Sequence, residues 1–334
     1  MNRSEQREER SDPLKQKTTK SKSHRIRRIF KIVALSLLCL ILLGFIYESI
    51  SEYIDSKTLV PPGQIVNVNG HKMHVYCTGE NNGKATVVLE SGAGGNYADW
   101  YKVQPELAKH TRVCSYDRAG LGFSDSTNNR HNNADVAYEL QRLLEVANIP
   151  APYVLVGHSL GGFNIRLYAN NNKDRVVGLV FVDSSVTEMD TLKPTFFQNI
   201  VGKIYGRLLV FSSYTGLMRL VMTINPNIYI YPTNTRLLLA GTVTPKQNIA
   251  ASKEVNDKNM SFNEVKKANN FGNIPVTVLT AKGSADETPV WKDWQYNLSK
   301  ISQNGKQILV PNSNHYIQVD QPQVVIDSIL ELAN

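Results

Sequence analysis

Short apolar runs alternate with longer amphipathic segments between residues 86 and 185. Residues 86–95, 112–125 and 175–183 each contain a short, mostly apolar run, and the first two continue into glycine-rich loops. Runs of this length, bounded by turn residues, are typical of buried strands. An amphipathic helix is predicted over Ala134–Ala147, directly before a further apolar run at residues 153–156. The alternation favours a mostly parallel sheet with helices on both faces.

The flanks of this region predict further elements. Asn69-Gly70 separates the apolar segments 65–68 and 73–77, and Asn-Gly in this position is the strongest short hairpin signal. Residues 275–280 and 307–310 are late strands, and an amphipathic helix is expected over residues 323–332. Between about residues 187 and 273 the alternation stops, and the stretch is rich in apolar and aromatic residues. It is too long for a plain loop, so we expect a mainly helical cap inserted between two strands.

The N-terminal part of the chain carries a long apolar segment. Residues 32–47 are sixteen uncharged, mostly apolar residues. As a helix they would span about 24 Å at ~1.5 Å per residue, a little short of a ~30 Å hydrocarbon core, and Ile29 and Phe30 extend the segment. We expect a transmembrane helix over residues 29–50 that acts as a signal anchor. The alternative is a cleaved signal peptide, but no small-x-small cleavage site follows Gly44.

The net charge of +8 is concentrated in the N-terminal tail. Residues 1–31 hold eleven Lys/Arg and four Asp/Glu, whereas the rest of the chain is nearly neutral. The charge therefore predicts no nucleic-acid binding by the folded domain. The tail, residues 1–28, has no periodic apolar face and is expected to be disordered. Because the basic flank precedes the apolar segment, the positive-inside rule places the tail in the cytoplasm and residues 60–334 outside it.

Ser159 stands in a pattern that is typical of a catalytic nucleophile. Residues 157–162 are Gly-His-Ser-Leu-Gly-Gly, with an apolar run before them and a helix-like stretch, 163–169, after them. A serine at a sharp strand-to-helix turn has a strained backbone and presents its hydroxyl at the top of a sheet. Gly157 and Gly161 remove side chains that would collide at such a turn. The alternative is a glycine-rich turn whose serine caps the helix.

Taken together, these segments resemble the α/β-hydrolase superfamily over roughly residues 60–334. The most specific pieces are Gly-His-Ser-Leu-Gly-Gly, the segment Tyr-Asp-Arg-Ala-Gly-x-Gly-x-Ser from Tyr116, and the late His315 before Asp-Gln-Pro. The resemblance implies an α/β-hydrolase fold with a mostly parallel, eight-stranded sheet and a cap at about residues 187–273. It also implies that the strands holding Cys77 and Cys114 are neighbours, which leaves open a disulfide or two buried free thiols.

A serine hydroxyl needs an adjacent base, and His315 is the candidate for this role. Among seven histidines it alone lies in a loop after a late strand, in the chain order nucleophile, acid, histidine. The acid that fixes its tautomer has two candidates. Asp286 follows the strand 275–280, where most members of the superfamily place the acid, but the loop before it is longer than usual. Asp183 ends an earlier strand, as in certain lipases and haloalkane dehalogenases, and we favour it.

The oxyanion of a tetrahedral intermediate needs hydrogen-bond donors, which we expect to be the backbone N–H groups of Ala93 and Leu160. The sequence thus predicts a membrane-anchored serine hydrolase that cleaves an ester, amide or thioester of a small or lipid-like molecule. No metal-ligand cluster or phosphate loop indicates a cofactor, and no obligate protein partner is evident. The alternative is a ligand-sensing or scaffold protein that keeps the fold with little turnover. The substrate is set by the cap, which has no motif that identifies it.

Overall fold

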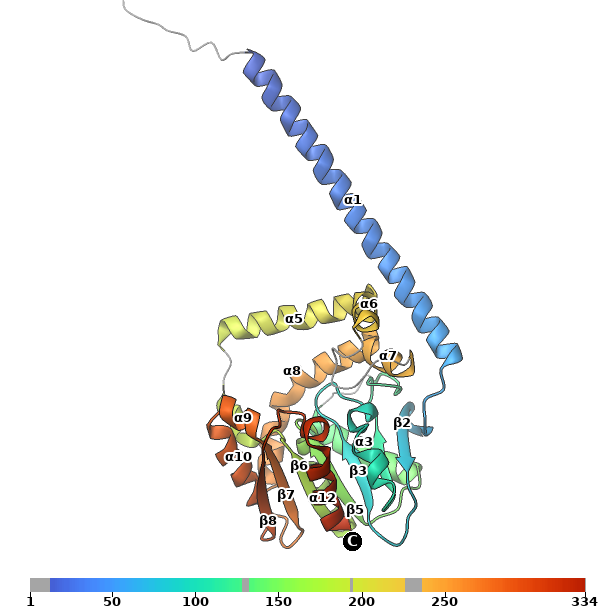
Figure 1. Ribbon diagram of the computed structural model, residues 1–334, viewed down its shortest axis with the longest axis vertical. Helices are drawn as coiled ribbons and strands as arrows, with labels where there is room; N and C mark the ends of the chain where they lie inside the picture. The colour runs from blue at the N-terminus through green and yellow to red at the C-terminus, as the bar shows by residue number, and fades with distance from the viewer. Residues whose placement is uncertain (1–12, 128–131, 193–194, 226–235, 334) are drawn as a thin grey trace, which may run out of the picture.

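The computed structural model describes residues 13–127, 132–192, 195–225 and 236–333 (Figure 1). Within these residues, eight strands form one sheet in the order β1-β2-β4-β3-β5-β6-β7-β8. Strand β2 is antiparallel to β1 and to β4, and all other neighbours are parallel. The strands are β1 Gln64–Val68, β2 His71–Thr78, β3 Thr86–Glu90, β4 Val113–Tyr116, β5 Tyr153–His158, β6 Val176–Val182, β7 Val276–Ala281 and β8 Gly305–Val310. The predicted mostly parallel sheet is confirmed.

The first two strands form the predicted hairpin. Asn69 and Gly70 have φ values of +52° and +91°, which is the left-handed pair that a two-residue hairpin turn requires. The Asn67 side chain accepts a hydrogen bond from the Gly70 N–H at 3.0 Å, which closes the turn. Further along β2, Cys77 lies directly opposite Cys114 of β4, and the two form a disulfide. The structure therefore contains the disulfide that the sequence left open.

Helices cover both faces of the sheet, and each face has its own apolar core. One core joins the sheet to α3 (Asn133–Val146), α4 (Gly161–Asn171) and α10 (Val290–Ser299). The other joins it to α2 (Gln104–Leu107) and α12 (Pro322–Ala333). On β5, Leu155 belongs to the first core, whereas Val154 and Val156 belong to the second. Side chains of a strand alternate between faces, so this apolar strand supplies both cores.

A helical cap is inserted between β6 and β7, as predicted. It comprises a short 3-10 turn at Thr187–Thr191 and the helices α5 Phe196–Tyr214, α6 Leu217–Ile224, α7 Arg236–Val243 and α8 Pro245–Lys267. Thr195 and Gln198 form a capping box at the start of α5. Thr244 caps α8, whose first residue is a proline, a residue that suits the first turn because it lacks an N–H. The remaining short helices include α9 Lys282–Glu287 and α11 Ile317–Asp320.

The N-terminal helix α1 runs from Pro13 to Thr58 and rises away from the domain (Figure 1). Its segment His24–Thr58 is long and apolar enough to cross a membrane, and its most apolar part is wholly unburied. The predicted disordered tail, residues 1–28, differs from the structure over residues 13–28, which are helical; residues 1–12 lie outside the described residues. Lysine and arginine are good helix formers, and no Gly or Pro follows Pro13 before Gly44, so the helix extends from the apolar segment into the basic flank.

Candidate active site

Ser159 occupies a sharp turn between β5 and α4. Its φ is +50°, a conformation that is uncommon for a residue with a side chain and that often marks a functional turn. The turn is tightly packed. A Cβ added to Gly157 would lie 2.8 Å from the carbonyl carbon of Gly161, and a Cβ added to Gly161 would lie 2.7 Å from the backbone carbonyl oxygen of Glu90. These contacts are too short for any side chain, so both glycines are required for the geometry that the sequence pattern predicts.

His315 lies in the loop between β8 and α11, and its Nδ1 atom is 2.8 Å from Oδ2 of Asp183. Asp183 directly follows β6, has a φ of +40° and is fully buried. Its carboxylate also accepts hydrogen bonds from the Ala281 N–H at 2.9 Å, the Ser284 hydroxyl at 2.7 Å and the Trp291 indole N–H at 2.8 Å. These donors fix both oxygens of the carboxylate, and the carboxylate in turn fixes the orientation of the His315 ring.

Asp286, the other candidate for the acid, is placed differently. It lies on α9 with its side chain largely exposed, and it pairs with Lys282 four residues earlier at 2.6 Å. Within the described residues, the structure brings Asp183 and not Asp286 into contact with His315. The long loop after β7, noted in the sequence, forms this short helix, which directs Asp286 towards solvent.

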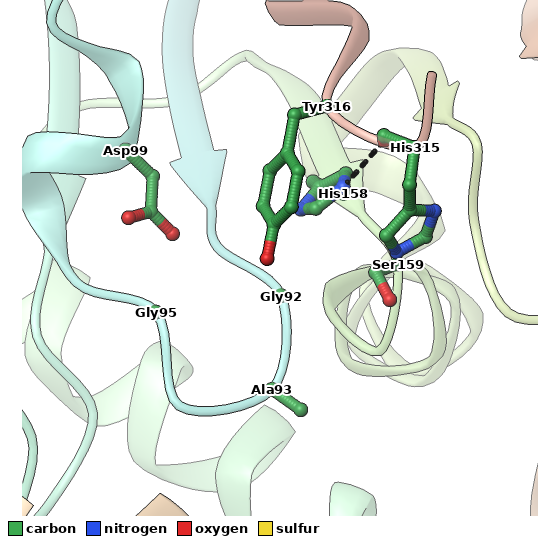
Figure 2. Close-up of a pocket in the computed structure, with 8 residues that line it drawn as sticks. All are labelled: Gly92, Ala93, Gly95, Asp99, His158, Ser159, His315 and Tyr316. Atoms are coloured by element: carbon green, nitrogen blue, oxygen red, sulfur yellow. Dashed lines mark hydrogen bonds between the residues drawn. The ribbon is translucent and has the colours of Figure 1, made fainter. Parts of the chain in front are cut away.

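A pocket of about 210 Å³ brings the candidate residues together (Figure 2). It is lined by Gly92, Ala93, Gly95, Asp99, His158, Ser159, His315 and Tyr316. Figure 2 shows Ser159 and His315 on one side, Asp99 on the other and the Tyr316 ring between them. Ala93 belongs to the loop after β3, and Leu160 directly follows Ser159. Neither the Ala93 nor the Leu160 backbone N–H donates to another group of the described residues, so both are available to a bound oxygen.

His158 shares the pocket but has a different environment from His315. It is buried, and its Nε2 donates to the backbone carbonyl of His315 at 2.9 Å. The centroids of the His158 and His315 rings are 4.7 Å apart. Burial, aided by the neighbouring His315, lowers the pKa of His158 to about 3. The side chain is therefore neutral near pH 7, and its bond to the carbonyl holds the His315 loop in place. This arrangement suits a supporting residue and not a base.

Comparison with known proteins identifies the fold. A profile of the alpha/beta hydrolase fold family matches residues 85–219, which contain the β3 loop, the Ser159 turn and Asp183. Solved structures that are similar to this chain cover about four fifths of it.

The chain has the α/β-hydrolase fold.

The resemblance predicted from the sequence is thereby confirmed. Two curated relatives align with most of this chain. The uncharacterized protein C23C11.06c of Schizosaccharomyces pombe is 28% identical over 294 residues, which are 77% of this chain but only 53% of that protein. The uncharacterized protein YqjL of Bacillus subtilis is 24% identical over 244 residues, 72% of this chain and 80% of the relative. This chain thus spans about half the length of the first relative.

Two solved structures illustrate the range of the fold. A thermophilic esterase from Thermogutta terrifontis matches with a TM-score of 0.58 and 17% identity, covering 80% of this chain and 96% of the esterase. The epoxide hydrolase CorEH matches with a TM-score of 0.56 and 18% identity, covering 80% of this chain and 97% of the epoxide hydrolase. At these identities the likeness concerns the fold alone, so the chemistry of this protein has to be argued from its own site.

A buried ionic network, not foreseen from the sequence, supports the loop that carries Ala93. Arg118 donates to the carbonyl oxygens of Ser91 at 2.8 Å and Gly92 at 2.6 Å. Glu254, on cap helix α8, accepts from Arg118 Nε at 2.6 Å and from the Gly94 N–H at 2.8 Å. Arg118 belongs to the Tyr-Asp-Arg segment on which the resemblance rests. Its partner Glu254 is 136 residues away in a cap without a recognised motif, so no local pattern pointed to Glu254.

Asp99 is a second pocket residue that the sequence analysis did not single out. It is buried, and burial raises its pKa to about 7 although the nearby Arg118 opposes the shift. Tyr316 faces the same pocket, and burial together with Asp99 raises the pKa of its hydroxyl. Within the part of the chain that the structure describes, no group of three or more His, Cys, Asp or Glu side chains is placed to hold a metal ion.

Proposed function

We propose that this protein is a serine hydrolase that cleaves an ester, amide or thioester through an acyl-enzyme. Ser159 is the nucleophile, His315 the general base and Asp183 the acid that orients it. The observation that carries the proposal is the 2.8 Å contact between His315 Nδ1 and the buried Asp183, with His315 and Ser159 in one pocket. A strained serine beside a histidine that is held by a buried carboxylate is the arrangement that activates a hydroxyl.

The proton transfers follow from the tautomer of His315. When Nδ1–H donates to Asp183, Nε2 is unprotonated and can accept the proton of the Ser159 hydroxyl. The serine oxygen then bonds to the carbonyl carbon of the substrate, and the leaving group takes the proton from Nε2 as the acyl bond breaks. In the second half, His315 takes a proton from water, the hydroxide adds to the acyl carbon, and Ser159 regains its proton as the acid product leaves.

The negative charge of each tetrahedral intermediate lies on the former carbonyl oxygen. We propose that the Ala93 and Leu160 N–H groups bind this oxygen, since both are free of other acceptors within the described residues. Removal of one such donor costs roughly 10²–10³ in turnover in comparable enzymes. The Arg118–Glu254 network would set the position of the Ala93 donor through the carbonyls of Ser91 and Gly92.

The proposal is tested by turnover of a panel of p-nitrophenyl esters of increasing acyl length, with the full chain in detergent micelles. We expect hydrolysis by the wild type, and loss of at least about 10³-fold in turnover in both Ser159→Ala and His315→Ala. Asp286→Asn is the matched control, because that side chain is exposed and paired with Lys282. Absence of turnover on every ester would favour a ligand-sensing protein that keeps the fold. Full turnover in Ser159→Ala would refute Ser159 as the nucleophile. The acyl-length profile would also indicate whether the substrate is small or lipid-like.

We further propose that α1 anchors the protein in a membrane, with its N-terminus in the cytoplasm and the catalytic domain outside. The most apolar part of α1 is unburied among the residues that the structure describes, and its length suits a single span. The basic flank lies on its N-terminal side, and cytoplasmic segments next to a span are enriched in Lys and Arg. An extracytoplasmic location also agrees with the Cys77–Cys114 disulfide, because such bonds persist in oxidising compartments.

A further inference from the structure

Cap helix α5 leaves most of its large apolar side chains exposed. Over the nineteen residues Phe196–Tyr214, only Ser213 is buried. The exposed fraction is 81% for Phe196 and 73% for Phe197, and the large side chains further along the helix are also exposed: Ile204, Tyr205, Leu208 and Phe211. The next helix, α6, ends in Ile224, which is 75% exposed. Contiguous apolar surface of this kind marks an interaction site.

The charges of these two helices are all of one sign. Helix α5 contains Lys203 and Arg207, one turn apart and both exposed, and α6 contains Arg219. Neither helix contains an aspartate or a glutamate. A helix with large apolar side chains, few charges and basic residues is typical of one that lies in the interface of a membrane, where lysine and arginine reach anionic headgroups.

The position of α5 next to α1 indicates where it would meet a bilayer. Figure 1 shows α5 along the side of the domain from which α1 rises. Phe45, near the end of the apolar segment of α1, contacts Phe211 and Tyr214 with ring centroids 6.3 Å and 6.1 Å apart. A Cβ added to Gly44 would lie 2.4 Å from the Thr215 oxygen, so the two helices approach closely. The end of α5 therefore lies level with the end of the apolar segment of α1.

Buried ion pairs hold the cap at this level. Arg219 of α6 bonds Glu48 at 2.7 Å and Asp55 at 2.8 Å, and Arg236 of α7 bonds Asp55 at 2.7 Å. Glu48 directly follows the apolar segment 32–47, so the polar contacts begin where the span ends. Glu48, Asp55 and Arg219 are all buried, and opening such pairs would leave uncompensated buried charges, which is strongly unfavourable. The cap is thus fixed relative to α1.

We propose that α5 and the exposed face of α6 lie in the bilayer interface beside α1, as a second membrane contact of the catalytic domain. The inference rests on the proposed placement of α1 in the membrane. The placement would also affect the site. Helix α5 packs on α8, and α8 contacts the loop after β3 that lines the pocket. A Cβ on Gly206 of α5 would lie 3.7 Å from Ser252 of α8, and one on Gly94 would lie 2.8 Å from Ala251. The bilayer would therefore support the loop that carries Ala93 through α5 and α8.

Spin labelling of the full chain in vesicles of anionic and zwitterionic phospholipid tests this placement. The chain has three cysteines, of which Cys77 and Cys114 are bonded, so Cys39 in α1 is the one site that labels without mutation. Leu208→Cys in a Cys39→Ser background reports on α5. Lys306→Cys in the same background is the aqueous control, because its exposed side chain pairs with Glu331 on α12, away from the cap. Each label is measured for collisions with oxygen, which concentrates in lipid, and with a nickel chelate, which stays in water.

We expect the labels at 39 and 208 to collide often with oxygen and rarely with nickel, and the label at 306 to show the opposite. A lipid-like result at 39 with a water-like result at 208 would overturn this inference while sustaining the anchor. Low accessibility of position 208 to both reagents would mean a protein partner, such as a second copy, and would also overturn it. A water-like result at 39 would contradict the anchor itself, and the inference with it.

Discussion

The Nδ1 atom of His315 lies 2.8 Å from Oδ2 of Asp183, and the same carboxylate accepts three further hydrogen bonds from Ala281, Ser284 and Trp291. These donors come from different elements, the end of β7, α9 and α10, so the position of the carboxylate does not depend on the histidine alone. Its own backbone is held at a φ of +40° after β6. The His315 ring is thus oriented by a group that the fold itself fixes.

The acid assignment predicts unequal effects of two matched substitutions. Asp183→Asn should reduce turnover by about 10³–10⁴-fold, because an amide at this position favours the wrong tautomer of His315. Asp286→Asn should leave turnover within about 2-fold, since it removes only an exposed ion pair with Lys282. Steady-state kinetics on an aryl ester, with circular dichroism to verify folding, measures both. The reverse ranking would transfer the role to Asp286.

The Glu254–Arg118 pair predicts that the cap contributes to catalysis by positioning the Ala93 loop. Glu254→Gln removes the charge that holds Arg118 and weakens the bond to the Gly94 N–H. We expect kcat to fall by about 10–10²-fold with a smaller change in KM, because an oxyanion donor acts mainly in the transition state. Asp190→Asn is the control, since it breaks an exposed pair with Lys266 of the same helix. An equal change in both variants, or a change in KM alone, would refute the positioning role.

Asp99 predicts a stability that depends on pH. Burial raises its pKa to about 7 from an ordinary value of 3.8, so between these values the unfolded chain is ionised while the folded chain keeps the proton. The contribution of Asp99 to folding therefore becomes less favourable as pH rises from about 4 to about 7, and is constant above that. Asp99→Asn should raise the thermal midpoint at pH 8 relative to the wild type, with little difference at pH 4.

Melting curves of the full chain in detergent at pH 4, 6 and 8 measure this dependence. At pH 8 the free energy of unfolding of Asp99→Asn should exceed that of the wild type by on the order of a few kcal/mol, because each pKa unit corresponds to about 1.4 kcal/mol. Asp293→Asn, at an exposed position on α10, is the control and should show no trend. A constant difference between Asp99→Asn and the wild type at all three pH values would mean that Asp99 is ionised in the folded protein.

The charge asymmetry around the apolar segment predicts the orientation of the chain. The basic flank that ends at Lys31 should stay in the cytoplasm, with residues from about 60 onward on the other side. Protease added to intact cells or spheroplasts should then digest the domain and spare an N-terminal epitope tag. A domain that resists protease until the membrane is permeabilised would show the opposite orientation.

Much of the fold could be predicted from the sequence because its signals are local. The Asn69-Gly70 turn, the apolar strand before Ser159 and the two glycines around the serine each act within a few residues, and the structure contains all of them. The choice between Asp183 and Asp286 could not be made locally. It depends on which loop end reaches a histidine 132 residues away from Asp183, and on α9, which turns Asp286 outwards.

The parts of the site that the sequence did not reveal are long-range and lie partly in the cap. Glu254 reaches Arg118 across 136 residues, and its helix has no pattern that distinguishes a ligand of an arginine from a solvent-exposed charge. Asp99 lies in the short 3-10 helix Tyr97–Trp100, which has no recognised motif, and only the packing of the pocket shows that it is buried. The tail over residues 13–28 was expected to be disordered from its composition, which does not reflect the apolar helix that it continues.

The most direct test of the central claim is to identify the residue that a fluorophosphonate modifies. Such a probe forms a covalent bond with an activated serine, so the full chain in detergent is labelled, digested and analysed by mass spectrometry. The account predicts an adduct on the peptide that contains Ser159, and no labelling of Ser159→Ala or of His315→Ala at the same probe concentration. An unmodified wild-type protein, or an adduct on a different serine, would contradict it.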